Sequence, residues 1–289
     1  MKPAPFDYFA PQSLDEALSL LAEHGDEAKL LAGGQSLIPV MNFRLAAPTV
    51  LIDLNNVPSL DYVRANGNLH IGAMTRQRTL ERNATIAQHA PLITQTMPLV
   101  AHAQIRNRGT LGGSLAHADP AGELPVIAVA LEARFKLQSQ RGERWVEAAD
   151  FFESLFTTSL EDDEILTEVV FPSLKPRTGY AFQELARRHG DYAQAGVAAV
   201  VTLAGNGTCD DVRLVFLNVG DVPMVAHDAM GMLRGERLSD EVIAAAAQHA
   251  AKNEIEPAGD VHGSAEYKRH LAGVLAKRAL RDAVQQIGE

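Results

Sequence analysis

The alternation of apolar and polar residues predicts an amphipathic helix shortly after the start of the chain. Ser13 and Glu16 have the spacing of a capping box, in which two side chains bond the first free N–H groups of a helix. The apolar residues that follow at helical spacing are Leu14, Ala17, Leu18 and Leu21. Because Gly25 is a natural end, we expect the helix to lie between Ser13 and Gly25 with one buried face.

Two short apolar runs predict β-strands on either side of a glycine pair. Residues 29–32 form the first run, which we expect to be a buried strand ending at Gly33 and Gly34, and residues 50–54 form the second. With the helix, these strands predict a small α/β unit over residues 1–54. The glycine pair then occupies a loop at the end of a strand.

The rest of the chain predicts two further units. For residues 55–174 we expect an α+β unit with strands at 69–73, 133–138 and 165–171 and helices around 75–102 and 121–131. The proline-containing stretch 171–179 predicts a linker. For residues 175–289 we expect strands at 180–188, 195–204 and 212–219 and helices at 239–253 and 264–285, the last with Tyr267, Leu271, Val274 and Leu275 on one face.

Composition and charge agree with a globular protein of several domains. The 289 residues are enough for two or three compact units, and 46% hydrophobic with 21% charged residues is typical of soluble proteins. We expect no membrane span, because no apolar run is long enough. The formal net charge of −10 argues against a nucleic-acid surface. The single Cys209 forms no internal disulfide and the N-terminus shows no secretory signal, so we expect a cytoplasmic protein.

The same counts exclude much catalytic chemistry from this chain. Iron–sulfur clusters and structural zinc sites need several thiolates or a dense Cys/His set, which one cysteine cannot supply. The ten histidines are scattered without metal-ligand spacing, and no nucleophile elbow or P-loop is present. We therefore predict no catalytic residue and no metal site.

A second glycine pair lies in RNRGTLGGSLAHADPAGELP, residues 106–125. Gly112 and Gly113 follow Thr110 and precede Ser114, while the first pair precedes Ser36. Glycines let backbone N–H groups converge on an anion, and nearby hydroxyls add donors. Because hydrogen bonds to a charged acceptor contribute about 1.5–3 kcal/mol each, two such loops suit a pyrophosphate even in an acidic protein.

Two other interpretations of the glycine pairs remain open. Each pair alone is compatible with an ordinary tight turn. A Rossmann-type fold is a further alternative, since Asp53 follows Gly33 at the spacing of a ribose-binding acid. Against it, the loop is GGQSLIP and Pro39 lies where the phosphate-binding helix should already run. Asp53 is then more simply a residue that makes turn contacts at a strand end.

The two glycine segments together, LLAGGQSLIPVMNFRL and QIRNRGTLGGSLAHADPAGELP, strongly resemble the FAD-binding medium subunit of the molybdenum hydroxylases. Carbon monoxide dehydrogenase and xanthine dehydrogenase belong to this family. Four more segments resemble the family in family order: PFDYFAPQSLDEAL, DDEILTEVVFP, ARRHGDYAQAGVAA and YKRHLAGVLAKRAL. The resemblance implies an α+β chain with a PCMH-type FAD-binding fold of two α/β subdomains, residues 1–54 and 55–174. A C-terminal domain, residues 175–289, would hold a three-stranded antiparallel sheet and helices.

The resemblance also implies the FAD contacts. The first phosphate loop would be Ala32, Gly33, Gly34, Gln35, Ser36 and Leu37, and the second Thr110, Leu111, Gly112, Gly113 and Ser114. Gln35 departs from the histidine that is common among carbon monoxide dehydrogenase relatives. Some relatives have a lysine in the stretch 183–186, where this chain has Gln183, Glu184, Leu185 and Ala186, so a lysine contact there is lost or replaced.

Single residues outside the loops extend the implied site. Glu123 stands at the position of an acidic residue near the sugar and adenine, although it could instead cap a helix starting near Leu124. Val100 would lie near the isoalloxazine and Leu166 beside the cofactor, with a plain core role as the alternative for both. Tyr192 would approach the flavin ring, or serve in the core or an interface. Arg106 and Arg108 would face a partner or phosphate, or belong to a solvated loop.

The family implies an electron-transfer function without acid–base catalysis in this chain. A large subunit carries molybdopterin, a small subunit carries two [2Fe–2S] clusters, and the medium chain passes electrons from the clusters through FAD to an external acceptor. A dimer of heterotrimers is the expected assembly. The substrate (carbon monoxide, a purine, an aldehyde or an N-heteroaromatic) is then recognised elsewhere. An alternative is a nucleotide-binding or assembly subunit without turnover.

Overall fold

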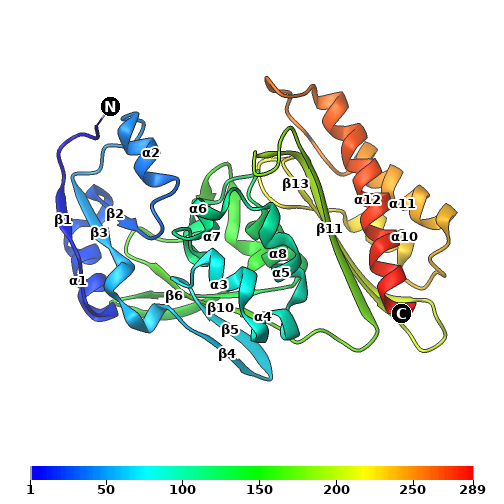
Figure 1. The fold of residues 1–289 in the computed structure, drawn as a ribbon, viewed down its shortest axis with the longest axis horizontal. Coiled ribbons are helices and arrows are strands. Elements are labelled where there is room, and N and C mark those ends of the chain that lie inside the picture. The colour runs from blue at the N-terminus through cyan, green and yellow to red at the C-terminus, as the bar shows by residue number, and fades with distance from the viewer. Residues whose placement is uncertain (1, 289) are drawn as a thin grey trace.

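Three main sheets, one in each unit, lie in a row along the long axis of the computed structural model, which describes residues 2–288 (Figure 1). The N-terminal unit lies at one end, a helix-rich unit lies in the middle, and a sheet backed by long helices lies at the other end. The predicted α+β architecture is confirmed. No helix within residues 2–288 is both long and apolar enough to span a bilayer.

The first unit is built on a parallel sheet in the order β1-β3-β2. Its elements are β1 (Asp7–Phe9), α1 (Leu14–His24), β2 (Ala28–Leu31), α2 (Leu37–Asn42) and β3 (Val50–Asp53), with 3₁₀ turns at Gly25–Glu27, Leu54–Asn56 and Pro58–Leu60. The expected helix is confirmed: the Ser13 hydroxyl accepts from Glu16 N at 3.2 Å. The expectation of a buried strand was wrong for Leu30 and Leu31, which are half-buried because β2 is an edge strand.

Helix α2 contains Pro39, contrary to the view that a proline there breaks the helix. Pro39 is the third residue of α2, in the first turn, where backbone N–H groups have no partner within the helix. The missing N–H of proline therefore costs nothing at this position.

The second unit is an antiparallel sheet in the order β4-β5-β10-β6-β7, with helices on one face (Figure 1). Its strands are β4 (Val63–Asn66), β5 (Asn68–Gly72), β6 (Arg134–Ser139), β7 (Gly142–Glu147) and β10 (Ile165–Phe171), with a small hairpin of β8 (Phe152–Ser154) and β9 (Thr157–Thr158). Its helices are α3 (Gln77–Arg82), α4 (Ala84–His89), α5 (Pro91–Thr96), α6 (Ala103–Arg106), α7 (Leu111–His117), α8 (Glu123–Ala130) and α9 (Ala148–Phe151), with a 3₁₀ turn at Met97–Leu99. Every residue of α8 is buried, because this helix also packs against the third unit.

The third unit is an antiparallel sheet in the order β11-β12-β13-β14. Its elements are β11 (Thr178–Ala186), β12 (Ala193–Leu203), β13 (Cys209–Leu217), β14 (Met224–Val225), α10 (His227–Leu233), α11 (Asp240–Asn253) and α12 (Ala265–Gly288). The two-residue β14 adds to the three expected strands. The helices cover one face of this sheet (Figure 1), while Phe182, Val200 and Leu217 on the other face join the core of the second unit.

The buried face of α12 differs from the expected one. Tyr267 is 42% exposed and Val274 is only half-buried. The buried residues are Lys268, Ala272, Leu275, Ala276, Ala279, Leu280 and Ala283. Small alanines lie against the sheet because they let the long helix approach it closely, and a search for large apolar residues does not detect them.

Candidate functional site

The two glycine pairs of the sequence come together between the first and second units. A Cβ built on Gly33 would stand 2.5 Å from the carbonyl oxygen of Arg108 and 2.7 Å from Cα of Gly109. No side chain fits at such distances. Gly33 is therefore required for the first glycine loop, residues 32–37, to lie directly on the backbone that leads into the second, residues 108–114.

Gly113 also lies close to the first glycine loop. Its Cβ would stand 2.7 Å from Oγ1 of Thr110, 3.2 Å from Cβ of Ala32 and 4.0 Å from the nitrogen of Gly33. Gly112, in contrast, has its backbone against Ala73, whose Cβ would be 2.5 Å from the added atom. The missing side chain of Gly113 thus leaves space between the two loops. The missing side chain of Gly112 lets α7 pack closely against Ala73, which follows β5.

The first loop turns sharply from β2 into α2. Gly34 has a φ of 74°, in the left-handed region that favours glycine. Gln35 bends back, and its Nε2 donates to the carbonyl oxygen of Gly33 at 3.0 Å. Ser36 and Leu37 lie at the start of α2, where Ser36 forms no side-chain cap. The Gln35 side chain thus stabilises its own loop.

Hydroxyl groups of the second loop already have protein donors. Thr110 begins α7, and its Oγ1 accepts from the N–H of Gly113 at 3.1 Å. Oγ of Ser114 accepts from Nε2 of Gln77 at 2.9 Å. A hydroxyl that accepts one bond still has its own hydrogen to donate, so both remain able to bond an anionic oxygen. Leu111, in contrast, is fully buried in the core.

The loops fit a phosphate-bearing group by their chemistry. Cβ atoms at Gly33 or Gly113 would fill the place where the loops meet, and the donors around it are backbone N–H groups and hydroxyls, which bind phosphate oxygens without a fixed charge. Gln77 also bonds this loop through its backbone, whose N–H donates to the carbonyl oxygen of Gly109 at 2.9 Å. Sequence reasoning missed Gln77, because no motif links it to the glycines.

Glu123 is the first residue of α8, and Gly122 is the N-cap, without a side-chain cap. Glu123 is therefore not the N-cap residue, although its carboxyl accepts from its own backbone N–H in the first turn of α8. Glu123 is 9% exposed. Burial, with a smaller contribution from the charge of Asp119, raises the pKa of its carboxyl to about 7.

A second acidic side chain, Glu184 on β11, lies near Glu123. Burial and then the charge of Glu123 raise the pKa of Glu184 to about 8. Its Oε2 is buried and has no hydrogen-bond partner among the described residues. Opposite it on β12 stands Gly196, where a Cβ would be 3.1 Å from Cβ of Glu184. The fold thus brings the carboxyl groups of Glu184 and Glu123 near each other, although the two residues lie far apart in the sequence.

Val100 and Leu166 both lie in the core of the second unit, with exposed fractions of 7% and 5%. The carbonyl oxygen of Val100 accepts from Nη1 of Arg106 at 2.9 Å. Their packing agrees with the core alternative, and a contact of either with a flavin stays a prediction.

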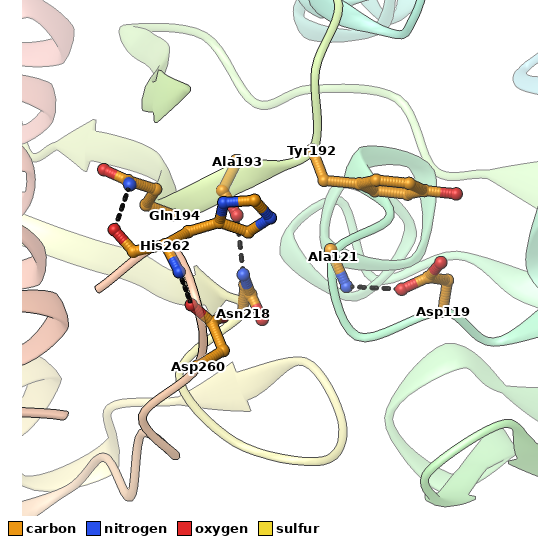
Figure 2. A pocket seen from close by; sticks show the side chains of 8 residues that line it. All are labelled: Asp119, Ala121, Tyr192, Ala193, Gln194, Asn218, Asp260 and His262. Carbon is orange, nitrogen blue, oxygen red and sulfur yellow. Dashed lines mark hydrogen bonds between the residues drawn. The ribbon is translucent and has the colours of Figure 1, made fainter. Parts of the chain in front are cut away.

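Tyr192 is 69% exposed, so a core role for it is wrong. It lines a pocket of 220 Å³ between the second and third units, together with Asp119, Ala121, Ala193, Gln194, Asn218, Asp260 and His262. Figure 2 shows Asp119 and Ala121 on the side of the second unit and Asp260, His262 and Gln194 on the other. Nε2 of Gln194 on β12 donates to the carbonyl oxygen of His262 at 2.8 Å. This bond attaches the segment that contains Asp260 and His262 to the sheet of the third unit.

The two arginines of the second glycine segment have structural roles that the sequence did not indicate. The Arg106 side chain is buried, pairs with Glu81 at 3.0 Å and donates to the carbonyl oxygens of Val100 and Ala101. The expectations of a partner, a phosphate or a solvated loop were therefore wrong for Arg106. Arg108 is exposed, and its carbonyl oxygen is the atom that meets Gly33.

Asp53 makes turn contacts, as the simpler interpretation predicted. Oδ1 accepts from the N–H of Asn55 at 2.9 Å, and Oδ2 accepts from the Tyr8 hydroxyl at 2.6 Å. Within residues 2–288, no group of three or more His, Cys, Asp or Glu side chains is arranged to hold a metal ion.

Comparison with known proteins gives the family. The model of the FAD binding domain in molybdopterin dehydrogenase matches residues 4–174. The chain belongs to this family. The model of the CO dehydrogenase flavoprotein C-terminal domain matches residues 180–283. FAD is accordingly the cofactor of this chain, an electron-transfer subunit of a molybdenum-dependent oxidoreductase, and the molybdenum and iron–sulfur centres belong to other subunits.

Individual family members match over almost their whole length. The 6-hydroxypseudooxynicotine dehydrogenase complex subunit alpha of Paenarthrobacter nicotinovorans is 44% identical over 99% of this chain and 97% of its own. A chain of the carbon monoxide dehydrogenase from Hydrogenophaga pseudoflava, in a form that lacks the Mo-pyranopterin moiety, is 40% identical, with a TM-score of 0.96 over 99% of both chains. Quinoline 2-oxidoreductase from Pseudomonas putida 86 has a TM-score of 0.94 at 37% identity, covering 100% of both chains. These similarities extend through all three units.

Proposed function

We propose that the chain holds FAD with its pyrophosphate between the two glycine loops. The observation that supports this most strongly is the close approach of the two glycine loops: a Cβ on Gly33 would clash with the backbone of Arg108 and Gly109, and a Cβ on Gly113 would stand 3.2 Å from Cβ of Ala32. Backbone N–H groups of the loops and the hydroxyls of Thr110, Ser114 and Ser36 would then bind the phosphate oxygens. This chemistry explains how a chain with a net charge of −10 binds an anionic cofactor.

We place the flavin ring toward the pocket between the second and third units. The segment from Ser114 through Asp119 to Glu123 leads from the second glycine loop to this pocket. The exposed ring of Tyr192 offers an aromatic face there. Glu123 and Glu184 would lie near the cofactor as buried carboxyls rather than as a lysine clamp. Val100 and Leu166 would contribute apolar packing behind it.

Bound FAD supplies the ability to accept two electrons and release them singly or in pairs. We propose that electrons arrive from [2Fe–2S] clusters of a small subunit, after substrate oxidation at the molybdopterin of a large subunit, and leave to an external acceptor. This chain binds and orients the flavin and needs no acid–base pair. A dimer of heterotrimers in the cytoplasm is the proposed assembly. Residues 1–54, 55–174 and 175–289 are its proposed domains.

The test is to purify the complex of this chain with its large and small subunits and to compare it with a Gly33→Ala complex. We expect the variant complex to keep molybdenum and iron but to lose FAD and with it the reduction of artificial electron acceptors. A variant complex that keeps its FAD content would contradict the assignment of the loops. A wild-type complex that turns over without FAD would favour an assembly role for this chain.

A further inference from the structure

Residues 75–77 run beside the second glycine loop and bring Arg76 to the boundary between the first and second units. Backbone bonds join the two segments, from Leu111 N to the oxygen of Thr75 at 3.0 Å and from Gln77 N to the oxygen of Gly109 at 2.9 Å. Arg76 has extended backbone before α3 and a half-buried side chain. The backbone pairing that shapes the second loop therefore also fixes the position of Arg76.

The Arg76 guanidinium donates to one oxygen of the second glycine loop and to one oxygen of Asn55, which directly follows the first unit. Nη1 bonds the carbonyl oxygen of Arg108, and Nη2 bonds Oδ1 of Asn55 at 2.5 Å. The Arg108 oxygen is the same atom that leaves Gly33 no room for a side chain. Because a guanidinium is planar and rigid, it fixes two oxygens relative to each other, which the single ammonium of lysine does not do.

Asn55 continues the contact to the first glycine loop. Its Nδ2 donates to the carbonyl oxygen of Ala32 at 2.9 Å. Asp53 holds Asn55 in place by accepting from its N–H at 2.9 Å and from its Nδ2, and the Tyr8 hydroxyl holds Asp53 at 2.6 Å. One continuous series of hydrogen bonds thus connects the backbone of the first loop to the backbone of the second.

The bond to Ala32 also sets the direction of an N–H group at the site. In a planar trans peptide the C=O and the N–H point in opposite directions. With the Ala32 oxygen turned toward Asn55, the N–H of Gly33 points away from Asn55. The Gly33 nitrogen lies on the side of the second loop, 4.0 Å from the Cβ position of Gly113. The bond from Asn55 to the Ala32 oxygen thus fixes the direction of the Gly33 amide.

We propose that Arg76 and Asn55 are positioning residues, which fix the spacing of the two glycine loops and the orientation of the Gly33 amide for FAD. They act through the carbonyl oxygens of Ala32 and Arg108. This role rests on the proposed function, because the ligand whose affinity it controls is the FAD between the loops.

The first experiment measures the FAD affinity of the full chain by quenching of flavin fluorescence in Arg76→Met, Arg76→Lys, Asn55→Ala and the double variant Asn55→Ala/Arg76→Met. The matched control is Arg78→Met. Arg78 lies two residues further on, is exposed, and donates Nη1 to Oδ1 of Asn107 at 2.8 Å. The Arg78→Met substitution therefore removes an arginine from the same segment without changing a bond to Ala32 or Arg108.

We expect Arg76→Met and Asn55→Ala to weaken FAD binding about tenfold to a hundredfold, with the control unchanged. The double variant should bind no more weakly than Arg76→Met, because both changes break one series of bonds. Arg76→Lys should not restore affinity. Wild-type affinity in Arg76→Lys would show that the charge of Arg76 acts rather than its fixed geometry, and would overturn the proposal.

The second experiment needs no FAD and compares amide hydrogen exchange in the FAD-free chains. We expect faster exchange in residues 32–38 and 108–114 of Arg76→Met, unchanged exchange in β11 to β13, and an unfolding midpoint close to wild type. Unchanged exchange in the loops, or faster exchange throughout the chain, would overturn the positioning role. If the loops loosen as expected but the wild-type chain takes up no FAD, the proposed function fails and the coupling of the loops stands.

Discussion

Gly33 and Gly113 lie close together across the boundary of the first and second units, with the Gly33 nitrogen 4.0 Å from the place of a Cβ on Gly113. Each glycine alone is compatible with an ordinary turn. Their approach in space brings two distant loops together, and the proposed phosphate site rests on this relationship.

Enlarging Gly113 should therefore disrupt FAD binding with little effect on the rest of the fold. The first atom of a valine side chain would stand 2.7 Å from Oγ1 of Thr110 and 3.2 Å from Cβ of Ala32. Overpacking costs about 1–3 kcal/mol, so we expect Gly113→Val to bind FAD about tenfold or more weakly. Titration of the full chain with FAD measures this.

Gly231→Ala is the matched control for that titration, because an added Cβ there meets nothing within 4 Å. It should bind FAD like the wild type. Equal affinity of Gly113→Val and the wild type would show that the glycine loops do not hold the cofactor.

Thr110 should contribute to stability through its oxygen. Oγ1 accepts from the N–H of Gly113 at the start of α7, at 3.1 Å. Loss of an N-cap costs about 1 kcal/mol, so Thr110→Ala should lower the free energy of unfolding of the FAD-free chain by this amount. Thr110→Ser, which keeps the oxygen, should retain most of it. Urea denaturation measures both, and equal losses in the two variants would contradict the capping role.

The carboxyls of Glu123 and Glu184 should make stability decrease as the pH rises. Burial raises their pKa values to about 7 and about 8, from 4.5. Between about pH 5 and 8 the folded chain therefore still holds protons that the unfolded chain has already released near pH 4.5, and the free energy of unfolding falls over this window, by at most about 1.4 kcal/mol per pH unit for each proton. Glu184→Gln removes one ionisable group and should reduce the slope. Urea denaturation over this pH range measures it, and a slope identical to the wild type would contradict the protonated state of Glu184.

The ion pair of Lys268 and Asp260, 2.7 Å apart, should respond unequally to the loss of each partner. The Lys268 side chain is 4% exposed and that of Asp260 is 40% exposed. Removal of one partner from a buried pair leaves an uncompensated charge at a cost of about 3–5 kcal/mol. Asp260→Asn leaves the buried Lys268 ammonium without its counter-charge, whereas Lys268→Met leaves a carboxylate that water can still reach. Asp260→Asn should therefore lower the free energy of unfolding more than Lys268→Met. Chemical denaturation ranks the two, and the reverse order would contradict the account.

Local signals in the sequence predicted those elements that depend on neighbouring residues. The capping box gave α1, and the apolar run 165–171 gave β10 with the same bounds. Where the position of a side chain depended on tertiary packing, the prediction from the sequence was wrong. Arg106 is charged and lies in a loop-like segment, but Glu81 and two carbonyl oxygens hold it in the interior.

The candidate site likewise contains residues that local motifs predict and residues that only the fold identifies. Glycine pairs with adjacent hydroxyls are visible as short motifs, so the two loops could be predicted. Asn55, Arg76 and Glu184 carry no motif. Asn55 and Arg76 acquire their roles through bonds to the distant Ala32 and Arg108, and Glu184 through burial and the nearby charge of Glu123. Such contacts exist only once the fold is known.

The measurement that tests the central claim most directly is the visible absorption spectrum of the purified chain, followed by acid release and mass identification of its cofactor. The account predicts flavin absorption bands and one FAD released per chain, directly or after reconstitution beside the large and small subunits. A colourless chain that takes up no FAD under either condition would contradict it.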